Sequence, residues 1–293
     1  MSIDKAVKEL EKEQFWVVSY KFEKYSIIGV YDKDETNNLG PYQNMTYFII
    51  DENSKKALVI DPGVRGKRGY LVKKILGIKD PTATVSHYHV DHWIGYGPYK
   101  NNRIYTSQFC IDVLTGKEEE GIVKVFKDGR LNWGHTRQVP QRVLDDLADE
   151  LPLNPKLFWP ISKLKNDFGV EFYELPGQTQ GSVYGCMEAD GKKILFANDL
   201  LIEGNGQLFI EIHYDFPPEG EVIRNHILAL KPIFGLSVKT GDKELRGLLK
   251  KIANPDVLLL GHGPFDIKRN RDKAVTLILE TEFGNNLVSK HTR

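Results

Sequence analysis

The sequence reads His87-Tyr88-His89-Val90-Asp91-His92 directly after an apolar, strand-like segment. This run places three imidazoles and a carboxylate close together, and these groups bind zinc, iron or manganese in proteins. Residues two apart on an extended segment share one face, so His87 and His89 are predicted to bind a single ion. Asp91 and His92 lie beyond the end of the predicted strand, where the chain turns and can reach a second ion. The sequence therefore predicts a site for one or two metal ions.

Other polar residues stand at or after the ends of predicted strands. Upstream of the histidines, an apolar run ends in Asp61-Pro62-Gly63. Three more motifs follow or end apolar runs downstream, and they are Leu175 to Ser182, Leu195 to Asp199 and Leu260 to Pro264. Candidate ligands are thus distributed over much of the chain.

Taken in order, these motifs resemble the signature of the metallo-β-lactamase superfamily of metallohydrolases. That signature has an aspartate on a second strand, then His-x-His-x-Asp-His, a Gly-His turn, a strand-end aspartate and a final Gly-His. The resemblance covers about residues 44 to 265; its first and last motifs are specific, whereas the middle ones are weak alone. It implies an α/β fold, a four-layer αβ/βα sandwich in which strand-end residues of the two halves meet at the metals.

The resemblance also implies which residues bind each ion. The first ion would be held by His87 and His89, and the second by Asp91, His92 and His262. Asp199 would bridge the two ions. Seven metal-site or supporting positions are retained, which favours a working site over a decayed one: Asp61, His87, His89, Asp91, His92, Asp199 and His262.

One position departs from the family pattern. Where the family has a histidine in a Pro-Gly-His-Thr turn, this sequence reads Pro176-Gly177-Gln178-Thr179. A glutamine carbonyl is a neutral, harder and weaker donor than imidazole, so the first ion keeps only His87 and His89 as strong ligands. Three outcomes are open: Gln178 binds through its oxygen, another residue substitutes, or a single ion binds. The candidate substitutes are His135, His213 and His226.

Length and composition indicate one enzyme-sized domain over residues 1–293. The 40 basic and 40 acidic residues cancel, which argues against a broad basic face for nucleic acid. No apolar run approaches a membrane span and the N-terminus is charged, so we expect a cytoplasmic protein without a membrane partner. A homo-oligomer is left open. The two cysteines, Cys110 and Cys186, lie in apolar surroundings and are predicted to be buried free thiols.

Strands and helices are predicted to alternate along the chain. An Asp190-Gly191 turn between two apolar runs is a strong signal for a β-hairpin. The predicted strands are 15–20, 26–31, 46–50, 57–60, 82–86, 170–175, 183–188, 193–197 and 209–214. The predicted helices are 3–13, 67–76, 217–230, 243–252 and 271–280.

A long insertion separates His92 from Gln178 and is predicted to form a cap at about residues 115–168. It has a predicted amphipathic helix over 141–151, with several prolines around it. Trp133 and Trp159 either contact an apolar substrate or anchor the cap on the core.

The expected mechanism is hydrolysis by a metal-bound hydroxide, with Zn²⁺ as one or two ions and Fe or Mn as alternatives. Asp91 would orient the water and move its proton. No basic cluster lies beside the metal motifs, which favours a small-molecule carbonyl ester, lactone or thioester over a phosphodiester. Two other classes stay open, namely an iron-dependent oxidoreductase on the same fold and a non-catalytic binding protein.

Overall fold

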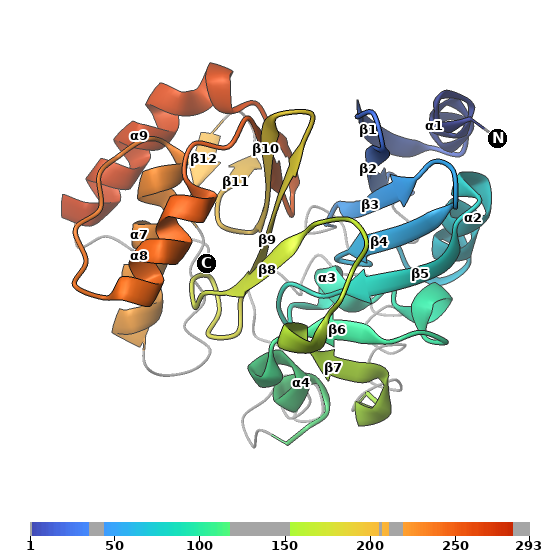
Figure 1. The fold of residues 1–293 in the computed structure, drawn as a ribbon, viewed down its shortest axis with the longest axis horizontal. Helices are drawn as coiled ribbons and strands as arrows, with labels where there is room; N and C mark the ends of the chain where they lie inside the picture. Colours follow the sequence, from blue (N-terminus) through green and yellow to red (C-terminus); the bar gives the residue numbers. More distant parts are fainter. Residues whose placement is uncertain (1, 35–43, 118–152, 205–206, 211–218, 284–293) are drawn as a thin grey trace. The chain divides into compact units, whose positions relative to one another are not determined.

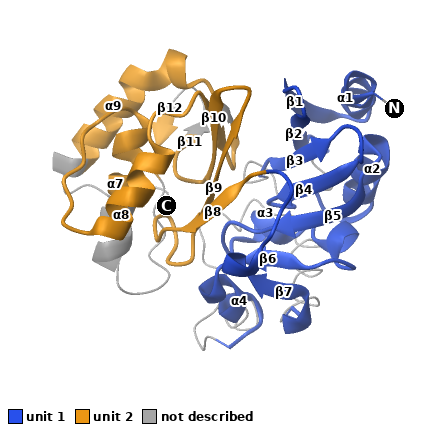
Figure 2. Ribbon diagram, in the orientation of Figure 1, with its two compact units in different colours: residues 1–168, 292–293 blue, residues 169–291 orange. Residues whose placement is uncertain are grey.

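The computed structural model describes residues 2–34, 44–117, 153–204, 207–210 and 219–283. The chain divides into two compact units, which we call unit 1, within Met1–Phe168, and unit 2, within Gly169–His291 (Figure 2). Each unit has its own main sheet, so both sheet-containing halves of the predicted α/β fold are present. The prediction of one domain over the whole chain stays a prediction.

Unit 1 is built on a sheet of seven strands in the order β1-β2-β3-β4-β5-β6-β7 (Figure 1). Neighbours pair antiparallel from β1 to β4 and parallel from β4 to β7. The middle strands are buried on both faces, which accounts for their unbroken apolar sequences. The strands are β1 Phe15–Lys21, β2 Tyr25–Asp32, β3 Thr46–Asp51, β4 Lys56–Ile60, β5 Lys79–Thr84, β6 Ile104–Thr106 and β7 Phe158–Pro160.

One helix of unit 1 connects two of its parallel strands. Parallel neighbours need a crossover connection, and α2, Gly66–Leu76, supplies it between β4 and β5. This helix ends at Gly77, whose φ of 66° lies in the left-handed region that glycine adopts without strain. The chain then enters β5, which leads to the predicted metal ligands. The other helices described in this unit are α1 Ile3–Lys12, α3 Val90–Trp93 and α4 Gln108–Leu114.

Unit 2 has a sheet of five strands in the order β14-β13-β10-β9-β8. Its strands are β8 Glu171–Glu174, β9 Val183–Ala189, β10 Lys192–Asn198, β13 Val257–Leu260 and β14 Gly263–Phe265. A separate hairpin pairs β11, Ile202–Gly204, with β12, Gln207–Phe209. Asp190 and Gly191 join β9 to β10 with φ values of 49° and 70°, as a tight hairpin turn requires, so this prediction is confirmed.

The helices of unit 2 pack on its sheet through one apolar core. Leu230, Leu249 and Ile278 come from the helices, whereas Leu195 and Leu258 come from β10 and β13. All five side chains are buried, and their burial holds the sheet and the helices together. The helices are α7 Glu219–Ile233, α8 Lys243–Ile252 and α9 Ile267–Phe283.

Most of the predicted elements are present with their ends shifted by up to four residues. β5 begins at Lys79 and ends at Thr84, two residues before the predicted end. It ends early because the Ser86 N–H donates to the Asp61 carboxylate at 2.6 Å instead of to a neighbouring strand. Only the first two residues of the predicted strand 209–214 are described, and of these Phe209 is the last residue of β12. Residues 211–214 lie outside the described ranges, so this strand stays a prediction there.

The predicted cap lies mostly outside the described residues, and so do Trp133, His135, His213 and the predicted helix 141–151. Its last part is described, and there Phe158–Pro160 form β7, which pairs with β6. This part of the predicted insertion therefore belongs to the sheet of unit 1. No helix among the described residues is both long enough and apolar enough to cross a membrane.

The two cysteines differ in exposure. Cys110 is fully buried in α4, and burial raises the pKa of its thiol to about 12. Cys186 on β9 is only partly buried, so the prediction of a buried thiol is wrong for this residue. Neither forms a disulfide, which confirms the prediction of free thiols.

Candidate metal-binding site

The histidine motif of unit 1 lies in a loop and a short helix. The N–H of Val85 still donates to the carbonyl of Tyr105 in β6, and residues 86–89 then connect β5 to α3, so the expected extended segment ends before His87. His89 occupies the N-cap position of α3, and this helix carries Asp91 and His92. The orientation of the His87 and His89 side chains is therefore set by this loop and not by the face of a strand.

The three imidazole rings of this motif lie against one another. The ring centroids of His87 and His89 are 4.4 Å apart, and those of His87 and His92 are 4.0 Å apart. All three side chains are buried. Because neutral imidazole is the commonest metal ligand in proteins, this arrangement favours a common ligand such as a metal ion.

Asp61 supports this motif from the end of β4. Its Oδ2 atom lies 2.9 Å from Nδ1 of His92, and its Oδ1 atom accepts the N–H of Ser86 at 2.6 Å. An ionised carboxylate only accepts hydrogen bonds, so it favours the tautomer of His92 that carries its proton on Nδ1. Nε2 of His92 is then deprotonated, as a metal ligand must be.

Two further residues contact the histidines and were not predicted from the sequence. The hydroxyl of Ser86 lies 2.9 Å from Nδ1 of His87. The amide nitrogen of Asn44 lies 3.2 Å from Nδ1 of His92. The available signal was their position, since Ser86 directly precedes the motif and Asn44 lies two residues before the predicted strand 46–50. Polar residues there do not identify their partner until the fold is known.

Gly63 allows this close packing. A Cβ atom at this position would lie 1.8 Å from Oδ1 of Asn44 and 2.3 Å from the carbonyl oxygen of Asp91. No larger residue fits between these groups. The glycine of Asp61-Pro62-Gly63 therefore allows the chain after β4 to pack closely against the backbone of Asp91 in α3.

Asp91 lies next to the imidazole edge that Asp61 leaves available. Its Oδ2 atom is 3.3 Å from Nε2 of His92. The Asp91 side chain is 10% exposed, whereas that of His92 is fully buried. Unit 1 thus places a carboxylate oxygen and an imidazole nitrogen together, and both are metal-ligand atoms.

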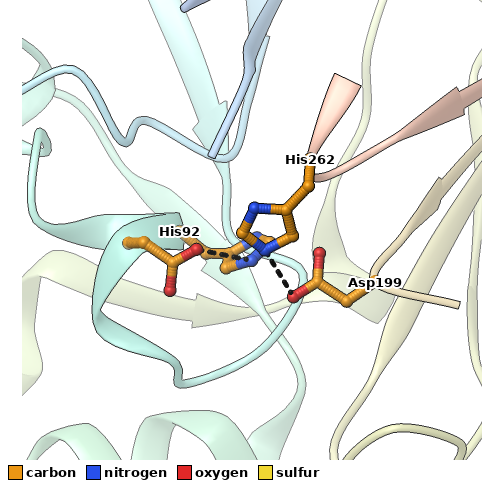
Figure 3. Close-up of side chains that lie close together, drawn as sticks. His92, Asp199 and His262 are labelled. Carbon is orange, nitrogen blue, oxygen red and sulfur yellow. Dashed lines mark ion pairs between the residues drawn. The ribbon is translucent and has the colours of Figure 1, made fainter. Parts of the chain in front are cut away.

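Unit 2 carries its candidate ligands at the ends of neighbouring strands. Asp199 follows β10, and His262 lies in the turn between β13 and β14. Because β10 and β13 pair in parallel, both residues lie at the same edge of the sheet. Oδ2 of Asp199 is 3.4 Å from Nε2 of His262, and a dashed line joins these two residues in Figure 3.

Gln178 joins this pair within unit 2. It lies in the turn between β8 and β9, and its Nε2 group donates to Oδ2 of Asp199 at 3.1 Å. Its Oε1 atom is buried and accepts no hydrogen bond from any residue that the structure describes. The sequence-predicted residues of unit 2, Gln178, Asp199 and His262, are therefore brought together.

His226 was one of the candidate substitutes for the missing histidine. The structure buries it on α7, with Nε2 at 2.6 Å from the carbonyl oxygen of Leu200. This contact ties α7 to the residue after Asp199. That ring nitrogen is therefore engaged by the backbone.

Trp159 lies on β7 between cationic side chains. The guanidinium carbon of Arg103 lies 3.8 Å from the ring centroid, and Nζ of Lys163 lies 5.6 Å from it. These contacts favour an anchoring role on unit 1. Contact with a substrate stays a prediction for Trp159.

A family model described as "Metallo-beta-lactamase superfamily" matches residues 39–262 of the sequence. No functionally curated protein matches it.

Solved structures with this fold resemble the chain at low sequence identity. A metallo-β-lactamase from Pontibacter korlensis is 14% identical with a TM-score of 0.48, over 91% of this chain and 99% of that one. TTHA1623 in a di-iron-bound form is 21% identical with a TM-score of 0.47, over 78% and 91% of the two chains. AidC, a dizinc quorum-quenching lactonase in complex with a product, is 15% identical with a TM-score of 0.42, over 64% and 75%.

Proposed function

Because the chain belongs to the metallo-β-lactamase superfamily, we propose that it is a metal-dependent hydrolase of a carbonyl ester, a lactone or a thioester. The family and the fold class predicted from the sequence are confirmed by the family match. The observation that carries the proposal is the buried group of imidazoles in unit 1, with Asp61 favouring the tautomer of His92 that can bind a metal. Neutral imidazole is the commonest metal ligand, so a shared metal ion would give this group a chemical role.

The residues of both units fit metal ions. Imidazole nitrogens and carboxylate oxygens are the donors that zinc, iron and manganese take in proteins. Oε1 of Gln178 is a buried acceptor that a cation would satisfy. We propose that the first ion is bound by His87, His89 and Gln178. The second would be bound by Asp91, His92 and His262, with Asp199 contributing to both.

The bound ions would lower the pKa of a coordinated water toward neutrality and polarise the oxygen of the attacked group. The chain's own residues would supply orientation and proton transfer. Asp61 orients the His92 ring, and Ser86 contacts the His87 ring at Nδ1. We propose that a carboxylate oxygen of Asp91 takes the proton of the attacking water and passes it to the leaving group.

The charge around the motifs favours an uncharged carbonyl substrate. No lysine or arginine occurs in the segments 83–99, 174–191, 194–209 and 255–267, which contain the candidate ligands from His87 to His262. A phosphodiester brings negative charge that arginine or lysine usually neutralises. An ester, lactone or thioester carbonyl needs no such partner.

The first test is hydrolysis of a chromogenic ester, a lactone and a thioester by protein loaded with Zn²⁺, Mn²⁺ or Fe²⁺. A chromogenic phosphodiester serves as the comparison substrate. We expect turnover of at least one carbonyl substrate, loss of turnover after chelation, and recovery when the metal is returned.

Two results would contradict the proposal. Absence of hydrolysis with every metal and every substrate would remove it. Oxygen consumption by the iron-loaded protein without hydrolysis would replace it by the oxidoreductase class.

A further inference from the structure

The backbone around Gln178 is fixed within unit 2. The N–H of Leu175 donates to the carbonyl of Ser182 at 2.9 Å, and the N–H of Gly177 donates to the carbonyl of Thr179 at 3.0 Å. The N–H of Thr179 donates to the hydroxyl of Ser182 at 3.1 Å. These bonds hold the chain on both sides of Gln178, so the turn presents its side chain in one direction.

Tyr184 fixes where this turn lies. A Cβ atom on Gly177 would come within 2.5 Å of the hydroxyl oxygen of Tyr184. Tyr184 is itself buried in the core of unit 2, and burial raises the pKa of its hydroxyl. The tyrosine cannot withdraw without opening that core, so glycine is required before Gln178. The position of the glutamine is therefore set by the fold.

The contact with Asp199 decides how the amide of Gln178 is oriented. The Asp199 carboxylate only accepts hydrogen bonds when ionised, so the NH₂ group must be the end that faces it at 3.1 Å. Oε1 then points away from Oδ2 of Asp199. It is buried and accepts no hydrogen bond among the described parts of the chain. A buried carbonyl without a partner costs free energy, which a bound cation would recover.

We propose that Gln178 has two roles at once: its Nε2 group orients Asp199, and its Oε1 atom is a weak ligand of the first ion. This inference rests on the proposed metal-dependent function and concerns how strongly each position is filled. A neutral amide oxygen binds a borderline metal such as zinc more weakly than an imidazole nitrogen. The second position has a histidine from each unit and no such substitution. The protein therefore holds one ion tightly and exchanges the other.

The test is a titration of metal-free protein with Zn²⁺ in competition with a chromophoric chelator. We expect two classes of site in the natural protein, with dissociation constants that differ by about 10-fold or more. Gln178→His provides an imidazole and should tighten the weak class by about 10-fold or more, while the tight class changes little. Gln178→Leu removes both roles, so it should abolish the weak class and also weaken the tight class.

Gln108 offers a matched control in unit 1. Its Nε2 group also donates to a carboxylate, Oδ1 of Asp112 at 3.0 Å, but the residue is exposed on α4. Gln108→Leu removes the same type of hydrogen bond and should leave both classes unchanged. Thermal unfolding of each metal-free variant shows whether Gln178→Leu is folded, and Gln178→His tests the proposal independently of that result.

The outcomes separate this inference from the proposed function. Two equal sites in the natural protein, or a weak class that Gln178→His leaves unchanged, would overturn the role of Gln178. In that case a loss of zinc in His262→Ala would still support the metal-dependent function. If the natural protein binds no zinc and hydrolyses nothing, the proposed function fails and takes this inference with it.

Discussion

The candidate ligands of the two units have different neighbours. In unit 1, Asp61 and Ser86 contact the ring nitrogens of His92 and His87, and the imidazoles pack on one another. In unit 2, Asp199 accepts an amide hydrogen bond from Gln178 and lies beside His262. Unit 1 keeps every candidate ligand of the family pattern. Unit 2 carries the one departure from that pattern, which is Gln178.

This contrast indicates that the two units contribute differently to metal binding. Partners that orient a ligand before the ion arrives reduce the cost of binding, so unit 1 supplies a preorganised set of imidazoles. Unit 2 supplies the carboxylate and the substituted position, which adjust how strongly the ions are held. A change in unit 2 should therefore alter affinity, whereas a change in unit 1 should also disturb the fold around the site.

Two single variants, each of which removes one imidazole, should have the largest effect on hydrolysis. His92→Ala and His262→Ala should each lower carbonyl ester hydrolysis by more than about 100-fold, since loss of a supporting partner alone costs about 10–100-fold. Their effects on stability should differ. His92→Ala leaves the buried Asp61 carboxylate without its imidazole, at a cost of about 1–3 kcal/mol. The side chain of His262 is 13% exposed and its loss should cost much less.

Initial rates and thermal unfolding of the metal-free proteins measure these two effects. Wild-type hydrolysis by His262→Ala would show that His262 does not contribute to the site. Equal destabilisation by both variants would remove the contrast between the units.

Whether the cores of the two units unfold separately can be tested with one core substitution in each unit. Phe48 is buried in β3 of unit 1 and Phe196 in β10 of unit 2, and replacing either by alanine should cost about 3–5 kcal/mol. The chain's four tryptophans all lie before residue 169, so tryptophan fluorescence reports on unit 1 and circular dichroism reports on both units. In metal-free Phe196→Ala, we expect circular dichroism to be lost at lower urea than the fluorescence signal.

The matched variant is Phe48→Ala, in which fluorescence should change first. Zinc should bring the two signals together if ions are bound by both units. Coincident transitions in the metal-free form of both variants would mean that the units unfold as one.

The sequence predicted the metal motif and most of the elements for physical reasons. His87 to His92 form a local pattern, and the apolar runs of β3, β4 and β10 are long enough to read as strands. The Asp190-Gly191 turn is equally local, because both residues adopt the φ values that the hairpin needs. Such features depend on neighbours in the chain, and a single sequence displays them.

The remaining features depend on contacts between distant segments. Asn44 and Ser86 became site residues only through their contacts with His92 and His87. β7 has three residues and was assigned to the cap, because a strand so short shows no periodicity before its pairing with β6 is known. The hydrogen bond from Gln178 to Asp199 was not predicted for the same reason, although both residues were named as candidate ligands.

The variant Asp61→Asn measures how much the Asp61 carboxylate contributes to zinc binding through its contact with His92. This change keeps the size of the side chain but removes the negative charge beside Nδ1 of His92. The asparagine amide can present either its oxygen or its NH₂ group, so the proton is no longer confined to Nδ1 and Nε2 is a poorer ligand. We expect the tighter zinc site to weaken by about 10–100-fold, with a smaller loss of stability than in His92→Ala.

Asp167→Asn is the control, because Asp167 is an exposed aspartate whose side chain pairs with Lys56 at 3.2 Å on the surface. An exposed pair of this kind contributes about 0–1 kcal/mol, so zinc affinity should be unchanged. If Asp61→Asn also binds zinc as tightly as the natural protein, the carboxylate does not orient His92. In that case packing around residues 86–89 would set the geometry of the unit 1 ligands. Gln178 alone would then distinguish the ligands of unit 2 from those of unit 1.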